Sequence, residues 1–290
     1  MLARGKWVVV GATAFVAAAG VYSLRHQTRK PSLDGSDAFV PLRVIHQQAL
    51  TPTAWHVRLH CEPFHVHPDG CYHVNVAEDQ SQSIRAFTPV HTPSPSEPYL
   101  DLIVRTYPWP YGEVARSLVR AQPGSFVRVQ GPVISLRWNE ALAKRPVVMV
   151  CGGTGITPMV QVLRYLKTHA AADSAVTLIY ANRSIQEIIA KHELEEIQAA
   201  KSLRIVHVIE DVKDNETTTT TTTTMVSGRV TLDLLRQSLP PPEANPLILV
   251  SGPSGMMESV CGDKRLNDER PFIGGWLKQL GYAPEHVFRF

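Results

Sequence analysis

The chain has 290 residues, of which 44% are hydrophobic and 19% are charged. These values indicate a globular protein of about two domains and exclude a disordered chain. The net charge of +3 is spread along the sequence without a basic run. We therefore expect no nucleic-acid partner. The four cysteines form no CxxC pair and no regular framework, so we expect no disulfide bonds.

Residues 7–24, WVVVGATAFVAAAGVYSL, contain no charge and have basic residues on both sides. This run is just long enough for a helix to cross the bilayer core. A cleaved signal peptide is the alternative, because Ala17, Ala18 and Ala19 could supply a cleavage site. The cysteine usage and the length of the run favour an N-terminal membrane anchor over residues 1–30. The basic residues after it favour a body on the cytosolic face.

Short alternating runs, broken by Pro, Gly and Ser clusters, occupy residues 36–145. The clearest are TAWHVRLH, CYHVNV, YLDLIVRTY and SFVRVQGP. Runs of this kind are typical of a small antiparallel β-barrel. We predict that this segment is the first folded domain.

A second domain is predicted over residues 146–290, beginning with the stretch VVMVCGGTGITPMVQVLRYL. Its first residues are an apolar run typical of a buried parallel strand. Pro158 suits the first turn of a helix, where its missing N–H costs nothing. The apolar positions of that helix share one face: Met159, Val162, Leu163 and Leu166.

Gly152, Gly153 and Gly155 separate this strand from this helix. Glycines here let a ligand approach backbone N–H groups at the positive end of the helix, which favours a phosphate site. A tight turn that needs glycine for its own geometry is the alternative, since the spacing is not GxGxxG.

The rest of the chain continues to alternate between strand and helix patterns: AVTLIYANR, IQEIIAKHELEEIQAA, LRIVHVIED, TLDLLRQSL and PLILVSGPSGMM. This order predicts an open, mostly parallel sheet with helices on its faces. The second strand that ends in glycine should lie beside the first, where such sheets bind ligands. Residues 217–224 are eight threonines, interpreted as a disordered or variable loop without chemistry.

Seven histidines and cysteines crowd residues 56–73, which raises the question of a zinc site. The segment has no CxxC pair, and its HxxxH spacing, His56 and His60, falls in a strand-like run. We interpret these residues as ordinary barrel side chains and expect no metal.

Five motifs follow one another along the chain: RAFTPV, GGTGITPM, YANRSIQEIIAKHELEEI, SGPSGM and the ending VFRF. Together they resemble the NADH-cytochrome b5 reductase family of the ferredoxin reductase-like superfamily. The resemblance covers about residues 40–290. It implies an FAD-binding barrel followed by a nicotinamide dinucleotide domain, with electrons passing from NADH through flavin to a haem protein.

The resemblance implies three segments that bind FAD. They contain Arg85, Ala86, Phe87, Thr88 and Pro89, then Val104, Arg105 and Tyr107, then Gly112, Glu113, Val114 and Ala115. Arg85 would pair with the pyrophosphate, Phe87 would pack on the flavin ring, and Thr88 would donate a hydrogen bond near that ring. Arg85 as an exposed residue at a strand end is the alternative interpretation. Ala115 replaces the family's serine, which should weaken FAD binding modestly.

The resemblance also implies the residues that bind the nicotinamide dinucleotide: Gly152, Gly153, Thr154, Gly155, Thr157, Pro158, Glu210, Gly252, Pro253 and Met256. Thr88 and Ser251 are the expected catalytic positions. Ser251 replaces the family's cysteine near the nicotinamide, and we expect slower transfer rather than an inactive enzyme, because the cofactors carry the chemistry.

Glu210 is the candidate for cofactor choice, because a carboxylate near the adenosine ribose disfavours the 2′-phosphate of NADPH. Arg183 could instead pair with that phosphate. We expect a preference for NADH.

The sequence thus predicts a membrane-anchored, monomeric FAD enzyme that reduces cytochrome b5 or a similar haem protein. The expected location is the mitochondrial outer membrane or the endoplasmic reticulum. One alternative is a catalytically weak flavodomain that serves as an assembly or carrier subunit, and another is a different acceptor, such as a quinone or ferredoxin.

Overall fold

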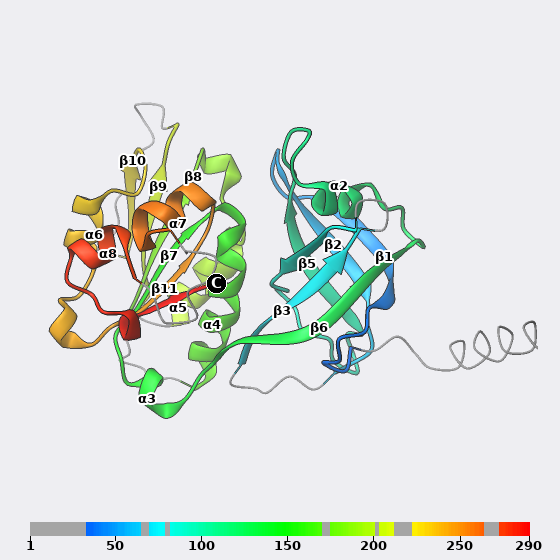
Figure 1. Cartoon of the computed structure of the whole chain (residues 1–290), viewed down its shortest axis with the longest axis horizontal. Coiled ribbons are helices and arrows are strands. Elements are labelled where there is room, and N and C mark those ends of the chain that lie inside the picture. Colours follow the sequence, from blue (N-terminus) through cyan, green and yellow to red (C-terminus); the bar gives the residue numbers. More distant parts are fainter. Residues whose placement is uncertain are drawn as a thin grey trace, which may run out of the picture.

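The computed structural model describes residues 33–64, 70–78, 82–169, 175–200, 203–211, 222–263 and 273–290. Two sheets lie side by side, and the chain passes from one to the other between β6 and β7 (Figure 1). The crossing occurs between Arg137 and Val147. The exact domain boundaries at residues 36, 145 and 146 stay predictions.

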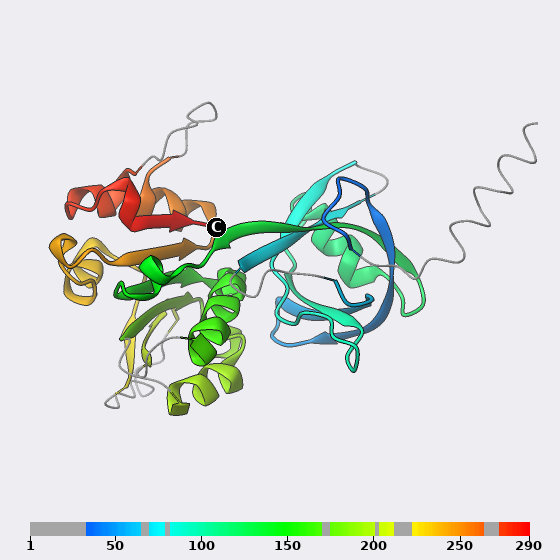
Figure 2. The same cartoon turned by 90° about the horizontal axis from the view of Figure 1, so that it is seen from below.

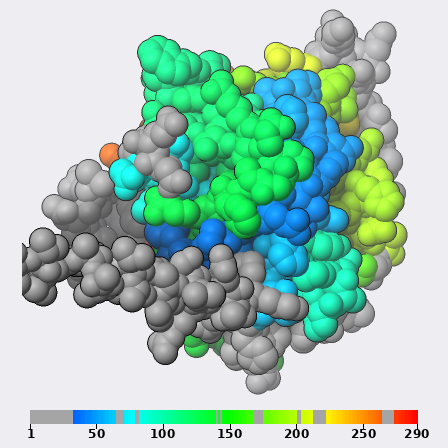
Figure 3. Space-filling view, turned by 90° about the vertical axis from the view of Figure 1, so that its right-hand side faces the viewer, coloured from blue at the N-terminus to red at the C-terminus, as the bar shows by residue number. Residues whose placement is uncertain are grey.

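The first sheet is a curled antiparallel half-barrel of six strands in the order β4-β3-β6-β1-β2-β5. Its strands are β1 (Val40–Ala49), β2 (Ala54–His60), β3 (Gly70–Ala77), β4 (Ile84–Phe87), β5 (Tyr99–Arg105) and β6 (Phe126–Arg137). β4 and β5 are its edges, so hydrogen bonds do not close it within the described residues. Figure 3 shows its outer face, where blue N-terminal residues lie beside green ones, as the β1–β6 pairing requires.

The second sheet has the strand order β10-β9-β8-β7-β11-β12, and all of its pairings are parallel. Its strands are β7 (Val147–Gly152), β8 (Val176–Asn182), β9 (Leu203–Ile209), β10 (Thr223–Ser227), β11 (Leu247–Ser251) and β12 (Val287–Arg289). Every residue of β7 is buried, as predicted for a central parallel strand.

Short helices cover this sheet and the half-barrel. The α-helices are α2 (Glu113–Arg120), α3 (Glu140–Ala143), α4 (Ile156–His169), α5 (Lys191–Ala200), α6 (Leu232–Ser238), α7 (Ser254–Cys261) and α8 (Gly275–Gln279). The 3₁₀ turns are η1 (Gly153–Gly155), η2 (Ile185–Glu187), η3 (Pro242–Ala244) and η4 (Pro284–His286).

Helix α4 lies on the side of the parallel sheet that faces the half-barrel (Figures 1 and 2). Its predicted apolar face is buried, with exposed fractions of 0–4%. Gln161, on the same helix, hydrogen-bonds the half-barrel: its amide oxygen accepts from Tyr72 N at 3.0 Å. Its amide nitrogen donates to the carbonyl oxygens of Tyr72 at 3.2 Å and Pro89 at 2.7 Å. The two sheets are therefore in direct contact through α4.

The helix predicted over residues 185–200 begins only at Lys191. Residues before it form η2, Ile188 is extended, and Ala190 has a φ of 58°. A residue in the left-handed region interrupts a helix, so the periodic pattern overstated its length. The loop predicted over the threonine run is too long at its end, because Thr223 and Thr224 begin β10 and pair with β9.

The predicted anchor over residues 7–24 lies outside the described residues. In the part of the chain that the structure describes, no helix is long and apolar enough to cross a membrane.

Candidate functional site

A cavity of about 900 Å³ lies between the two sheets and is lined by residues of both. This volume is near the upper end for ligand pockets, which suits an extended ligand such as a dinucleotide. Its barrel wall is formed by β4, β5 and the start of α2, and its other wall by the turns after β7 and β11.

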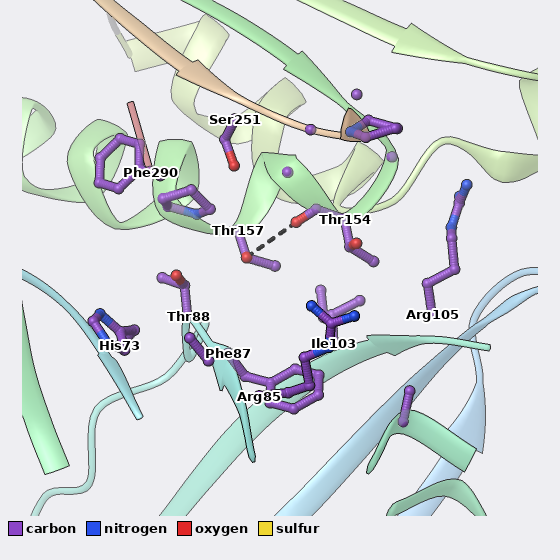
Figure 4. Close-up of a pocket in the computed structure, with 18 of the residues that line it drawn as sticks. His73, Arg85, Phe87, Thr88, Ile103, Arg105, Thr154, Thr157, Ser251 and Phe290 are labelled. Atoms are coloured by element: carbon purple, nitrogen blue, oxygen red, sulfur yellow. Dashed lines mark hydrogen bonds between the residues drawn. The ribbon is translucent and has the colours of Figure 1, made fainter. Parts of the chain in front are cut away.

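The barrel wall carries four consecutive predicted residues that all line the cavity: Arg85, Ala86, Phe87 and Thr88. They lie on β4 and directly after it, and β4 is an edge strand paired only with β3. Figure 4 shows Arg85, Phe87 and Thr88 on the side of the cavity opposite Ser251. Arg85 and Ala86 are exposed and Phe87 and Thr88 are half-buried, so their side chains are accessible to a ligand.

The start of α2 closes one end of this wall. Gly112 precedes the helix with a φ of 70°, a conformation that glycine adopts without strain. The helix's own bonding begins at Arg116 N, which donates to Gly112 O at 2.9 Å. The N–H groups of the first turn are therefore directed toward an outside acceptor. Gly112 and Ala115 line the cavity, as does Tyr107 nearby.

The glycine turn after β7 forms much of the opposite wall, and Gly152, Gly153, Thr154, Gly155, Thr157 and Pro158 all line the cavity. A Cβ on Gly155 would lie 2.3 Å from the carbonyl oxygen of Ser251. Tight packing of the two turns thus requires glycine at this position, which accounts for the turn interpretation. It also leaves the backbone of η1 open to the cavity, which is what the phosphate interpretation needs.

The second turn carries Ser251, Gly252 and Pro253, and all three line the cavity. β11 pairs with β7 so that Ser251 lies opposite Cys151. The prediction that the two glycine-bearing strand ends lie side by side is confirmed.

The charge of the cavity is positive. Arg85, Arg105 and Arg289 line it, and no Asp or Glu side chain does so within the described residues. FAD and a nicotinamide dinucleotide each carry a pyrophosphate, and guanidinium groups and helix N-termini are the groups that bind it. The residues present therefore fit both cofactors.

Six predicted contact residues do not line the cavity: Pro89, Val104, Glu113, Val114, Glu210 and Met256. Val104 is fully buried in the half-barrel core, and Val114 is 2% exposed. Met256 packs behind the glycine turn, since its Sδ lies 3.2 Å from where a Cβ on Gly152 would be. Glu210 pairs with Arg229. Their direct contacts with a cofactor stay predictions.

Other lining residues were missed, including His73, Ser135, Ile103, Tyr111, Ser254, Phe288, Arg289 and Phe290. His73 Nδ1 lies 2.7 Å from Ser135 Oγ, and burial lowers the pKa of His73. Phe288, Arg289 and Phe290 belong to the ending VFRF, which could have indicated them. The first three residues of this ending form β12, which pairs with β11. Sequence reasoning did not single out His73, because it belongs to the histidine-rich segment that was interpreted as ordinary barrel side chains. In the described part of that segment, the structure shows no cluster of side chains that could hold a metal ion.

Comparison with known proteins gives two family matches. Residues 65–138 match the oxidoreductase FAD-binding domain, and residues 149–262 match the oxidoreductase NAD-binding domain. These matches assign FAD to the half-barrel side of the cavity and a nicotinamide dinucleotide to the parallel sheet. Fold and cavity together define an FAD- and NAD-binding oxidoreductase.

Individual relatives agree. An NADH-cytochrome b5 reductase-like protein of Arabidopsis thaliana is 34% identical over 208 residues, covering 71% of this chain and 60% of the relative. An NADH-cytochrome b5 reductase 2 of Neurospora crassa is 33% identical over 210 residues, which cover 71% of this chain and 58% of the relative. The cytochrome b5 reductase domain of Ulva prolifera nitrate reductase has the same fold, with a TM-score of 0.68 at 19% identity, covering 90% of this chain and 100% of that one.

The chain belongs to the NADH-cytochrome b5 reductase family, within the ferredoxin reductase-like superfamily. Its matched region spans about 60% of the length of the first two relatives.

Proposed function

We propose that this chain is an FAD-dependent oxidoreductase that passes electrons from NADH to cytochrome b5 or a similar one-electron haem protein. The observation that carries the proposal is the single positive cavity lined by both the FAD-binding and the NAD-binding side. Bound FAD would supply the exchange between a two-electron donor and a one-electron acceptor.

The chain's own residues bind and orient the cofactors. Arg85 pairs with the FAD pyrophosphate, Phe87 packs on the flavin ring, and Thr88 donates a hydrogen bond to that ring. The first-turn N–H groups of α2 hold FAD phosphate, and the glycine turn of η1 holds the pyrophosphate of NADH. Phe288 and Phe290 line the same cavity and exclude water from it.

The acceptor is proposed from the names of the relatives, which are called cytochrome b5 reductases. A quinone or a ferredoxin is the alternative acceptor. Steady-state reduction of purified cytochrome b5 by the full chain and NADH tests the proposal. Reduction of a quinone or ferredoxin in preference to cytochrome b5 would assign a different acceptor.

A catalytically weak flavodomain that acts as an assembly or carrier subunit is the second candidate. Two cavity residues favour it: Ala115 lacks the hydroxyl that the resemblance places there, and Ser251 lacks the thiol. The purified protein should be yellow and should bleach when NADH is added without oxygen. A yellow protein that NADH does not bleach would favour the second candidate.

We further propose that residues 7–24 anchor the chain in the mitochondrial outer membrane or the endoplasmic reticulum, with the body facing the cytosol as a monomer. The uncharged run with flanking basic residues supports this proposal. Recovery of the full chain in the membrane pellet after alkaline carbonate extraction would support it, and recovery in the supernatant would contradict it.

A further inference from the structure

Glu187 is a buried carboxylate of the parallel-sheet half whose hydrogen-bonding partners come from the half-barrel. It ends η2, and its side chain is 8% exposed. Its Oε2 accepts from Thr51 Oγ1 at 3.0 Å and from Thr53 Oγ1 at 2.7 Å. Arg105 Nη2 donates to the same oxygen at 3.0 Å. These four residues, called the clasp below, connect the two halves.

Arg105 ends β5 and extends from the half-barrel toward the glycine turn (Figure 4). Its Nη1 lies 3.0 Å from where a Cβ on Gly153 would be, so the guanidinium lies against this turn. Its Nε is buried and has no hydrogen-bond partner. Arg105 therefore keeps an unused donor on the wall where an anion is expected.

The glycine turn and the Glu187 segment are joined behind the cavity. The buried Tyr180 hydroxyl donates to Gly153 O at 3.1 Å and accepts from Ile189 N at 3.2 Å. This hydroxyl thus links the glycine turn directly to the segment that carries Glu187.

Carboxylate and pyrophosphate compete for a guanidinium, because both accept its paired N–H donors. We propose that Glu187 is a positioning residue that holds Arg105 against the glycine turn, and that the pyrophosphate of a nicotinamide dinucleotide takes Arg105 from it. Binding of the dinucleotide then opens the clasp between the two halves. This inference rests on the proposed function for the identity of the nucleotide.

This competition predicts the direction in which a mutation of Glu187 changes the affinity for the nucleotide. Glu187→Gln keeps the shape of the side chain but leaves the Arg105 charge buried without a counter-charge, which destabilises the nucleotide-free protein. A pyrophosphate restores the counter-charge, so the variant gains more from binding than the wild type does. A residue with a merely structural role would lower stability without raising nucleotide affinity.

The experiment titrates ADP-ribose, which carries the pyrophosphate without the nicotinamide, into the FAD-loaded full chain in detergent. Calorimetry should give a Kd for Glu187→Gln at least about fivefold below the wild-type value. Without ADP-ribose the Tm of the variant should be lower, and the rise in Tm on adding ADP-ribose should be larger.

Two further variants separate the causes. Glu193→Gln removes a carboxylate that pairs with Arg164 inside the same half, and it should leave the Kd unchanged. Thr53→Val removes a donor to Glu187 but keeps the charge, so it should lower the Tm without tightening ADP-ribose binding. An unchanged or higher Kd in Glu187→Gln, or an equal tightening in either control, would overturn the inference, as would a wild type that does not bind ADP-ribose.

The proposed function has its own readout, because it requires NADH to bleach the wild-type flavin. A wild type that binds ADP-ribose but is not bleached refutes the proposed function and leaves the clasp to be judged by its Kd values. A bleached wild type with equal Kd values refutes the clasp alone.

Discussion

Arg85 is the exposed cation of the barrel wall, on an edge strand that faces the cavity. Arg85→Ala should give largely colourless protein, because a charge-assisted pair to the FAD pyrophosphate contributes roughly 1.5–3 kcal/mol. The measurement is the flavin absorbance per protein after dialysis. Arg120→Ala, which removes an exposed arginine at the end of α2 away from the cavity, should stay yellow. Full FAD occupancy in Arg85→Ala would contradict its assigned role.

Glu210 lies just after β9 and is 39% exposed, and its Oε1 is 3.1 Å from Arg229 Nε. We expect the wild type to prefer NADH, since this carboxylate repels a 2′-phosphate. Glu210→Thr removes the repulsion and frees Arg229 to pair with that phosphate.

The ratio of kcat/KM for NADPH to that for NADH should therefore rise by about tenfold, equivalent to about 1.4 kcal/mol. Glu195→Thr, at an exposed position of α5, is the control. A wild type that prefers NADPH would assign the choice to another residue, such as Arg183.

At the scale of strands, Asp101 on β5 pairs across the sheet with Arg58 on β2. Arg58 donates from Nε to Asp101 Oδ1 and from Nη2 to Oδ2, each at 2.8 Å, and His56 Nε2 lies 3.0 Å from Oδ1. Burial raises the pKa of Asp101, but the hydrogen bonds from His56 and Arg58 outweigh it and lower the pKa from 3.8 to about 2. The folded state thus favours the ionised carboxyl.

Because the folded pKa is depressed, this stabilisation is complete above a pH of about 4 and is lost as the pH falls toward 2. Asp101→Asn should lower the free energy of unfolding at pH 7 by about 2 kcal/mol. Urea unfolding should show that difference narrowing below a pH of about 4. Asp233→Asn, which breaks the exposed pair with Arg236, should cost under about 0.5 kcal/mol at every pH.

The two glycine-bearing turns depend on each other through Gly155. In Gly155→Ala the new Cβ would lie within 2.3 Å of the backbone of Ser251, so the turns must separate. We expect loss of NAD⁺ binding with FAD retained, and a stability cost of about 1–3 kcal/mol. A Cβ on Gly255, in α7, would meet nothing within 4 Å, so Gly255→Ala should bind NAD⁺ normally. Normal titration of NAD⁺ into Gly155→Ala would show that the turns tolerate separation.

Sequence patterns predicted the elements whose burial follows a simple period. The strand–glycine–helix unit at residues 147–166 is one, because its strand is buried throughout and its helix has one apolar face. They missed β1, where Pro41 and two glutamines obscure an alternation in which only Leu42 and Val44 are buried. They could not place Glu187, because its partners lie more than 80 residues away along the chain.

At the scale of the whole molecule, the predicted anchor ends before the half-barrel begins. Leu33 is 2% exposed and packs in the half-barrel core, and Gly35 N donates to Gly131 O at 2.9 Å. Deleting residues 1–30 should give a soluble protein with unchanged turnover of NADH and ferricyanide.

Deleting residues 1–35 removes Leu33 as well, and it should lower the free energy of unfolding by about 2–5 kcal/mol. The two deletions together locate the start of the fold. Loss of turnover in the shorter deletion would show that residues 1–30 belong to the folded body.

Gln161 presents the half-barrel with both a donor and an acceptor, as a neighbouring strand would. Both groups lose their protein partners when either half melts. The same melting exposes apolar residues of a core that the two halves share, since Cys71 and Ile103 of the half-barrel cluster with Met159 of α4. We therefore expect the two sheets to unfold as a single cooperative unit. Heating should then release FAD and the nicotinamide dinucleotide in one transition, although the two cofactors bind on different sheets.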